Sequence, residues 1–256
     1  MSTVLRSKKQ GVANGDSLLV LHGWGMNISV WDTVKESLEG QFQVIWLDLP
    51  GHGDNHEVHA QNLAEIVDHI LPLIKHPMHI MGWSLGGLIA QEVMRQRPEL
   101  VKRVVMVAST PRFSDSCNWK NAMSREVLEA FSDNLLKDIQ GTIKRFIALQ
   151  FMGVKGSQAI QRELRDNLLK NLPDEAALML GLDILKHQDF RKLTTDHQQL
   201  WVLGEKDRLV PVKIESDLRR LFPAASLKII SDAGHAPFMT HPEQFENTVI
   251  EFLTAK

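Results

Sequence analysis

The sequence predicts an α/β protein built on a mostly parallel sheet, and three observations carry this prediction. Apolar runs of strand length alternate with segments of helical period, a glycine-rich turn joins one such strand to a helix, and a long stretch without strands interrupts the alternation. Parallel strands need helical connections over the faces of their sheet, so this alternation is typical of a parallel sheet. We therefore expect one core domain with an insertion.

The first half of the chain supplies most of the expected strands. Apolar runs suited to buried strands lie at 17–22, 42–47, 78–80 and 103–109, and apolar residues at helical spacing fill 63–71. In parallel α/β sheets ligands collect at the carboxyl ends of the strands. The loops that follow these strands are therefore the expected walls of the functional site.

The second half of the chain contains the expected insertion. From Cys117 to about Phe190 only helical patches occur, which is too long for one ordinary crossover. Strands resume at 199–204 and 226–230, and a last helix is expected at 242–253. We predict a core formed by 1–114 and 191–256, with 115–190 as a helical cap over the carboxyl edge of the sheet.

Composition narrows the class of protein. A chain of 256 residues with 43% hydrophobic residues can bury a sizeable core, and 29 basic against 31 acidic residues give no general attraction to nucleic acid or membrane. The single cysteine, Cys117, excludes an internal disulfide and a cysteine-based zinc cluster. No apolar run approaches the length of a membrane span, and residues 1–10 lack the apolar core of a signal peptide. We expect a soluble cytoplasmic monomer.

No cofactor or metal is expected. His52, His56 and His59 are the only loose histidine cluster that suggests a metal site, and no cysteine or trio of carboxylates completes it.

Ser84 is the candidate nucleophile. It lies in the turn 82–87, between an apolar strand and a segment that suits a buried helix, and Gly82 and Gly86 permit the close backbone packing of a sharp turn. Such a turn places the serine hydroxyl above the sheet edge, near the N–H groups of a helix N-terminus. This position suits attack on a carbonyl, although a serine that caps a helix is the alternative interpretation of this motif alone.

A serine hydroxyl becomes a good nucleophile only when a general base takes its proton, and the base needs an acidic side chain to orient it. Asp207 and His235 each follow their own late strand, so the order nucleophile, acid, histidine fits Ser84 without adjustment. Glu205 and Asp232 are rival acids with less suitable loop positions. We predict that Ser84, Asp207 and His235 form a catalytic triad.

The oxyanion of such a reaction needs two fixed donors. We expect the backbone N–H of Leu85, the residue after the nucleophile, and the backbone N–H of Trp24, in the loop after the first buried strand. The ring of Trp24 can pack in the core at the same time.

Five motifs together resemble the α/β-hydrolase family over essentially the whole chain. They are His22–Gly25, Asp48–Gly53, Gly82–Gly87, Gly204–Asp207 and Gly234–Phe238. Relatives often carry a serine where this chain has Asp54, a departure in a surface turn that hardly affects the chemistry.

More narrowly, four features resemble the BioH family of biotin-pathway carboxylesterases, which remove the methyl group from pimeloyl-[acyl-carrier protein] methyl ester. The features are His22–Gly25, Trp83 and Leu85 beside Ser84, Arg145–Gln150, and His235–Phe238. This resemblance implies an acyl channel whose lining would be Phe146, Ile147, Ala148, Leu149 and Gln150 together with Trp24, Ser84, Leu85 and His235.

The charge of the expected cap can be compared with what a substrate bound to acyl-carrier protein would require. Residues 137–170 contain seven basic and three acidic residues, whereas the whole chain has a net charge of −2. Because acyl-carrier protein is acidic, basic residues around an apolar channel would suit its docking. The candidates are Lys144, Arg145, Arg162 and Arg165. An ordinary solvated helix face explains the same charges.

The leading functional hypothesis is therefore a serine carboxylesterase that works through an acyl-enzyme on the methyl ester of pimeloyl-[acyl-carrier protein]. A generic short-chain carboxylesterase, a C–C bond hydrolase and a cofactor-free perhydrolase would use the same triad. From another class, a non-catalytic α/β-hydrolase that serves as a binding module stays an alternative.

Overall fold

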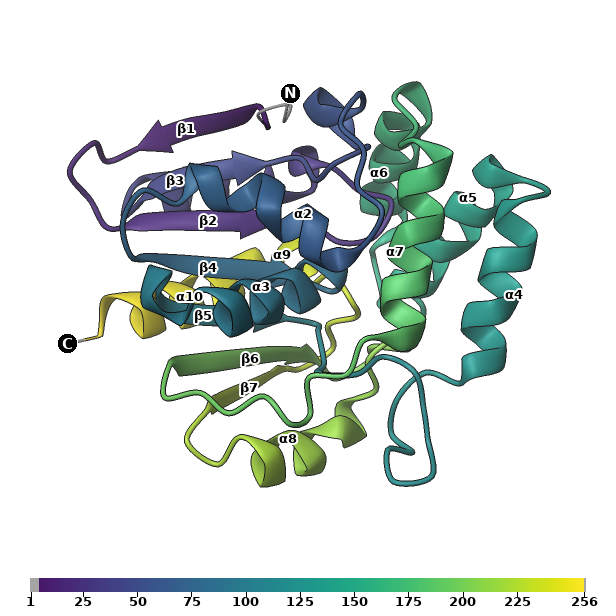
Figure 1. Ribbon diagram of the computed structural model, residues 1–256. Helices are drawn as coiled ribbons and strands as arrows, with labels where there is room; N and C mark the ends of the chain where they lie inside the picture. Colours follow the sequence, from purple (N-terminus) through teal and green to yellow (C-terminus); the bar gives the residue numbers. More distant parts are fainter. Residues whose placement is uncertain (1–4, 256) are drawn as a thin grey trace.

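The computed structural model describes residues 5–255, and it is organised around one seven-stranded sheet (Figure 1). The order across the sheet is β1-β3-β2-β4-β5-β6-β7, and only β1 runs antiparallel to its neighbour. The strands are β1 (Ser7–Gly11), β2 (Ser17–Leu21), β3 (Gln43–Leu47), β4 (Met78–Trp83), β5 (Val101–Val107), β6 (Gln198–Gly204) and β7 (Ser226–Ile230). The predicted α/β fold with a mostly parallel sheet is confirmed.

Strand β1 was not predicted, and its sequence explains why. The strand reads Ser-Lys-Lys-Gln-Gly and is exposed along its whole length, so it has no apolar pattern. Hydrogen bonding to β3 stabilises this strand, and the pairing runs between Ser7 opposite Leu47 and Gly11 opposite Gln43. Lysines on such an edge strand also discourage pairing with another chain. By contrast, all five residues of β2 are buried, as a continuous apolar run predicts.

Helices of the core cover both faces of the sheet. They are α1 (Lys35–Glu39), α2 (Leu63–Ile70), α3 (Leu85–Gln96), α8 (Glu215–Leu221), α9 (Pro237–Thr240) and α10 (Pro242–Thr254). Short 3-10 turns occupy Ile28–Trp31, Gly53–Asn55, Leu71–Leu73, Pro98–Leu100 and Val212–Ile214. Helices α2 and α3 pack together on one face of the sheet, and α1 and α10 pack together on the other (Figure 1). No described helix within residues 5–255 combines the length and the apolar character that crossing a bilayer requires.

Local sequence sets where a core helix begins. The side chain of Asn62 accepts a hydrogen bond from the N–H of Glu65, while the Glu65 carboxylate accepts one from the N–H of Gln61. The first bond satisfies an N–H group that the first turn of α2 leaves free, and the second ties the chain before the helix to that turn. The apolar positions Leu63, Ile66, Val67 and Ile70 are then buried together, as their helical spacing predicts.

Four helices lie between β5 and β6 and cover the carboxyl ends of the strands (Figure 1). They are α4 (Arg125–Leu135), α5 (Ile139–Gln150), α6 (Gln158–Lys170) and α7 (Glu175–His187). We propose that this segment is a cap inserted at 115–190. It contacts the core through Trp24, whose Nε1–H donates to the Leu178 carbonyl at 2.8 Å. A Cβ at Gly181 would lie 2.5 Å from the Trp24 ring, so glycine permits this close approach.

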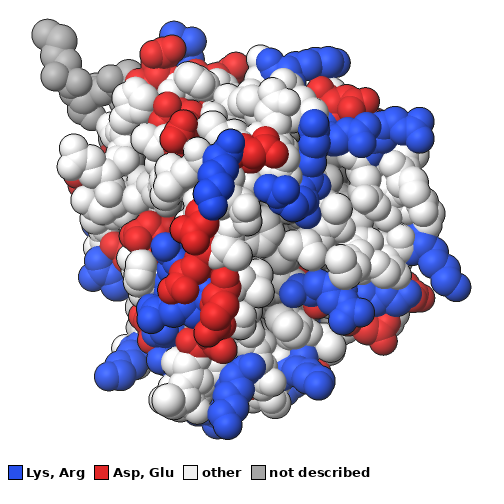
Figure 2. Space-filling model, turned by 90° about the vertical axis from the view of Figure 1, so that its right-hand side faces the viewer, with Lys and Arg blue, Asp and Glu red and all other residues white. Residues whose placement is uncertain are grey.

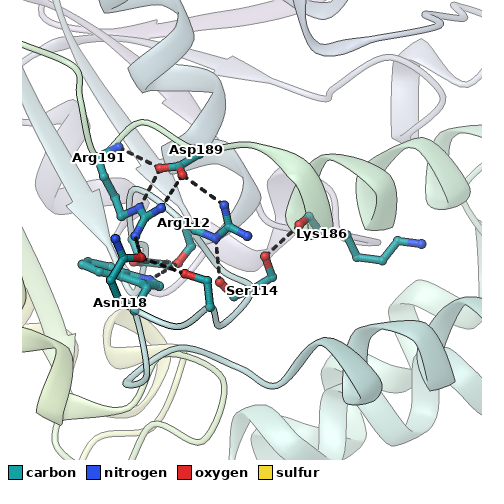
Figure 3. A network of polar contacts seen from close by, with 9 residues as sticks. Arg112, Ser114, Asn118, Lys186, Asp189 and Arg191 are labelled. Atoms are coloured by element: carbon teal, nitrogen blue, oxygen red, sulfur yellow. Dashed lines mark hydrogen bonds and ion pairs between the residues drawn. The ribbon is translucent and has the colours of Figure 1, made fainter.

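The two connections between core and cap are tied to each other (Figure 3). The carboxylate of Asp189, after α7, accepts hydrogen bonds from Arg112, before α4, at 3.0 Å and from Arg191 at 2.7 Å. The hydrogen bonds of Arg191 are the main reason why the pKa of Asp189 falls to about 2. The Phe190 N–H also donates to the Pro111 carbonyl at 2.8 Å. These contacts join both ends of the cap at its base, so its position over the sheet is defined.

Candidate active site

Ser84 lies in the sharp turn between β4 and α3. Its φ of 54° and ψ of −114° are unusual for a residue with a side chain, which marks strain of the kind found at functional sites. The Ser84 N–H donates to the Val107 carbonyl at 2.9 Å, and the Ser109 hydroxyl donates to the Ser84 carbonyl at 2.9 Å. A Cβ at Gly82 would lie 2.2 Å from the Gly86 carbonyl oxygen. The glycine spacing therefore permits the turn, and neighbouring strand ends hold it.

Asp207 and His235 meet at the same edge of the sheet. The Nδ1 atom of His235 lies 2.7 Å from Oδ2 of Asp207, and both side chains are fully buried. Oδ1 of Asp207 accepts the N–H groups of Leu209 at 2.8 Å and Val210 at 3.0 Å. Because Nδ1 donates to the carboxylate, Nε2 of the neutral ring is left as an acceptor. Nε2 is buried and has no hydrogen-bond partner among residues 5–255.

The backbone of His235 is held on both sides. The indole N–H of Trp83, the residue before Ser84, donates to the His235 carbonyl at 2.7 Å. The His235 N–H donates to the carbonyl of Gln150, the last residue of α5, at 2.9 Å. The rings of Trp83 and His235 are 5.7 Å apart between centroids. The structure thus brings the histidine next to the strand end that carries Ser84.

The rival acids have other partners. Glu205 accepts the N–H of Asp232 at 2.9 Å through its carboxylate, and the side chain of Asp232 pairs with Lys206. Asp232 is 71% exposed, and the hydrogen bond from Lys206 is the main reason why its pKa is lowered. Only Asp207 of the three carboxylates contacts the His235 ring in the described part of the chain.

The two expected oxyanion donors flank Ser84. Leu85 is the first residue of α3, so its N–H has no acceptor within the helix. Trp24 lies in a turn closed by the Met26 N–H, which donates to the Gly23 carbonyl at 3.3 Å. A Cβ at Gly23 would lie 3.3 Å from Cβ of Ser84, so this turn passes directly beside the serine.

His22 fixes the direction of the Trp24 N–H. Its Nδ1–H donates to the Gly23 carbonyl at 2.8 Å, and its Nε2 accepts the Leu49 N–H at 3.0 Å. The Gly23 carbonyl and the Trp24 N–H belong to one planar peptide unit and point in opposite directions. Anchoring the carbonyl therefore orients the N–H. Sequence reasoning named His22 only as part of the motif His22–Gly25, because a side chain that bonds a neighbouring backbone carbonyl leaves no sequence pattern.

Buried histidines behind this turn make stability depend on pH. Burial lowers the pKa of His22 from 6.5 to about 4, and burial, with the charge of His22 as a smaller cause, lowers the pKa of His52 to about 3. Between these values and 6.5 the unfolded chain binds more protons than the folded chain. The folded state should therefore lose stability as pH falls from about 6.5, and His22 alone should account for a loss on the order of 2 kcal/mol at pH 5.

Urea unfolding at pH 7.5 and pH 5 measures this loss. In His52→Leu the difference between the two pH values should shrink, whereas His56→Asn, which changes an exposed histidine, should leave it unchanged. A free energy of unfolding that is equal at both pH values would contradict the expectation.

The residues expected to line an acyl channel do not all face one way. On α5, Phe146, Ile147 and Gln150 are buried, whereas Ala148 is exposed and Leu149 is half-buried. The Phe146 ring packs edge-on against the Trp24 ring, with centroids 4.8 Å apart. Consecutive residues of a helix point in different directions, so the continuous run cannot line a single surface. Ala148 and Leu149 therefore lie on a different side of α5 from Phe146, Ile147 and Gln150, and an acyl channel lined by residues 146–150 stays a prediction.

Ala148 and Leu149 instead line an open apolar groove of about 430 Å³ between α4 and α5. The groove is completed by Val127, Ala130, Phe131, Asn134, Arg145 and Met152. Its Phe131 ring packs edge-on against Phe146, with centroids 5.8 Å apart. Phe131, Phe146 and Trp24 thus form a continuous line of aromatic contacts from the outer surface of the cap to the loop beside Ser84.

The basic candidates lie on the outside of the cap. Lys144, Arg145 and Arg162 are exposed, and Arg165 is half-buried and pairs with Asp166 at 3.1 Å. Arg145 also lines the apolar groove. Figure 2 looks onto this side of the molecule and shows Lys and Arg side chains spread over its upper, right-hand and lower parts, with Asp and Glu between them.

Comparison with known proteins gives the family. Residues 16–242 match the family model described as the alpha/beta hydrolase fold. The chain belongs to the α/β-hydrolase family. The family named from the sequence motifs is therefore confirmed. In α/β-hydrolases the nucleophile, acid and histidine follow one another along the chain in that order, and the predicted residues Ser84, Asp207 and His235 have the same order.

Curated α/β-hydrolases extend the likeness over nearly the full length. The chain is 39% identical over 246 residues to a protein of Vibrio campbellii named pimeloyl-[acyl-carrier protein] methyl ester esterase, covering 95% of this chain and 96% of the relative. It is 37% identical over 263 residues to a protein of the same name from Pseudoalteromonas atlantica, covering 97% and 100%.

Solved α/β-hydrolase structures support the fold alone. An esterase from Exiguobacterium antarcticum matches with a TM-score of 0.86 at 18% identity over 98% of this chain and 96% of that chain. A bromoperoxidase from Bacillus anthracis matches with a TM-score of 0.88 at 17% identity over 96% and 94%. These proteins have similar folds but are named for different activities. The fold therefore does not determine the reaction, which depends on the residues of the site.

Proposed function

We propose that this α/β-hydrolase is a serine carboxylesterase that removes the methyl group from pimeloyl-[acyl-carrier protein] methyl ester. The observation that carries the proposal is the buried Asp207–His235 pair, 2.7 Å apart, in which Nε2 of His235 has no hydrogen-bond partner among residues 5–255. The indole of Trp83, the residue before Ser84, holds the His235 backbone. The names of the curated relatives favour the carrier-bound methyl ester over the short esters, C–C bonds and peracids considered above.

The reaction would run through an acyl-enzyme. Nε2 of His235 accepts the proton of the Ser84 hydroxyl while Oγ attacks the ester carbonyl, and Asp207 holds the imidazole in the required tautomer. The N–H groups of Leu85 and Trp24 stabilise the oxyanion. His235 then gives its proton to the departing methanol. Water repeats the sequence on the acyl-enzyme and releases the free carboxylic acid.

The cap would provide the route for the acyl chain and its carrier. The apolar groove between α4 and α5 has a surface that suits methylene groups. Its Phe131 ring packs against Phe146, which packs against Trp24. The basic side chains of Lys144, Arg145, Arg162 and Arg165 suit the acidic surface of a carrier protein. We further propose a monomer that works in the cytoplasm with this carrier as its partner, without cofactor, metal, nucleic acid or membrane.

Charge reversal on the cap tests the carrier-bound substrate. In the double variant Arg145→Glu/Arg162→Glu, we expect kcat/KM for a carrier-bound dicarboxylic monomethyl ester to fall by about tenfold or more, since like charges would then meet at the docking surface. A short nitrophenyl ester needs no docking, so its kcat/KM should stay within about twofold of the wild type. Steady-state rates on both substrates measure the difference.

The matched control is Arg219→Glu/Lys228→Glu, which makes the same change of charge on exposed residues of α8 and β7 in the core. This control should hydrolyse both substrates as the wild type does. Equal losses on both substrates in the cap variant would argue against docking there. Comparable kcat/KM values for both esters in the wild type would reduce the proposal to a generic carboxylesterase.

A further inference from the structure

Gln150 is a buried glutamine with both ends of its side-chain amide unpartnered. The residue is 1% exposed, and neither Oε1 nor Nε2 has a hydrogen-bond partner among residues 5–255. The other two buried glutamines, Gln91 and Gln199, each have only Oε1 buried without a partner in that part of the chain. Buried polar groups without partners are rare because they cost stability, and those that persist commonly have a functional reason.

The backbone of Gln150 lies against the loop that carries His235. Its carbonyl accepts the N–H of His235 at 2.9 Å, and a Cβ at Gly234 would lie 2.4 Å from the same oxygen. Phe146 lies one turn earlier on the same face of α5 and packs against Trp24. Helix α5 therefore contacts both the Trp24 ring and the loop of the catalytic histidine, and Gln150 lies where α5 meets that loop, with both of its amide ends buried.

The chemistry of the proposed reaction limits which molecules the Gln150 amide can bind. Methylene groups of an acyl chain form no hydrogen bonds, and the oxyanion has the N–H groups of Leu85 and Trp24. A small hydroxyl compound both donates and accepts, as the two ends of an amide require. Nε2 of His235 is likewise buried and has no hydrogen-bond partner within the described range 5–255, and it must take a proton from such a compound in the second half of the reaction.

We propose that Gln150 forms the binding subsite for the small hydroxyl reactant, namely the hydrolytic water and, in the reverse direction, methanol. This proposal rests on the acyl-enzyme route given under the proposed function. One O–H of water donates to Nε2 of His235, and the other donates to Oε1 of Gln150. Methanol has a single O–H, so it would donate to Nε2 of His235 and accept a hydrogen bond from Nε2 of Gln150. The water oxygen bonds to the acyl carbon as His235 takes the first proton. The bond from that carbon to Oγ of Ser84 then breaks, and Oγ receives the proton from His235.

The variant Gln150→Leu, with a nitrophenyl ester as substrate, tests whether Gln150 binds the hydrolytic water. Nitrophenolate leaves without help from a proton donor, so its release in the first turnover should be unchanged. The steady-state rate should fall by about tenfold, which is the effect of losing one hydrogen bond of ordinary strength. Acyl-enzyme on Ser84, measured by intact mass during turnover, should accumulate. The melting temperature should stay equal or rise, because leucine removes two unpartnered polar atoms from a buried position.

Gln199→Leu is the matched control. Gln199 is also buried with an unpartnered Oε1, but it lies near the start of β6, at the sheet edge opposite the strand ends that carry the site. This variant should leave both the first turnover and the steady-state rate unchanged. Gln150→Met repeats the test with a flexible side chain of similar length, in case leucine does not pack.

The possible results distinguish a failure of the proposed Gln150 subsite from a failure of the proposed function. Equal losses in the first turnover and at steady state, or rates equal to the wild type in Gln150→Leu and Gln150→Met, would overturn the role of Gln150. A wild type that forms no adduct at Ser84 would instead overturn the proposed function. Accumulated acyl-enzyme with an unchanged first turnover would support both.

Discussion

Replacing Ser84 with alanine is expected to lower kcat for ester hydrolysis by about a millionfold, the loss seen when a triad nucleophile is removed. No other hydroxyl of this turn can take its place, since Ser84 is the one hydroxyl residue among positions 82–87. We expect Ser84→Ala to keep the folded structure of the wild type, because the turn is held through the backbone N–H and carbonyl of residue 84. Steady-state rates and a labelled fluorophosphonate measure the loss.

The fluorophosphonate result also decides between enzyme and binding module. We expect one adduct per wild-type chain and none in Ser84→Ala. Ser132→Ala, which removes another buried serine hydroxyl in α4, should react as the wild type does. An adduct that persists in Ser84→Ala would place the nucleophile elsewhere. A wild type that never reacts would favour a non-catalytic α/β-hydrolase.

Much of the fold follows from local sequence, and the exceptions have a common cause. The buried strand β2 and helix α2 were predictable because each contains its own apolar pattern. Strand β1 was not, because its polar residues take their conformation from hydrogen bonds to β3, about forty positions away in the chain. Elements stabilised by distant partners leave little signal in their own residues.

The candidate site divides in the same way. The turn at Ser84 could be predicted since the spacing of Gly82 and Gly86 is a local requirement of its backbone. The orientation of the Trp24 N–H by His22 and the bond from Gln150 to His235 could not, because both depend on how loops and cap pack in three dimensions. Sequence identified residues 146–150 as a group, but only the helix shows which of them face inward.

Replacing Asp207 with asparagine is expected to lower kcat by about ten-thousandfold with little change of structure. Oδ1 of Asp207 already accepts two backbone N–H groups, from Leu209 and Val210, so the asparagine oxygen should stay at that position. Its NH₂ group would then face Nδ1 of His235 and donate to it. A ring that accepts at Nδ1 carries its proton on Nε2 and cannot remove the proton of Ser84. The loss thus comes from the wrong tautomer rather than from unfolding.

Steady-state rates and melting temperatures together check this reasoning. Asp48→Asn is the matched control, because the buried carboxylate of Asp48 also accepts two backbone N–H groups, from Ile28 and Asp54, but does not contact His235. This control should lose far less activity than Asp207→Asn. If Asp207→Asn stayed within about tenfold of the wild type while Glu205→Gln lost most activity, Glu205 would be the acid. The loop would then have to rearrange during turnover, because Glu205 is bonded to the Asp232 N–H.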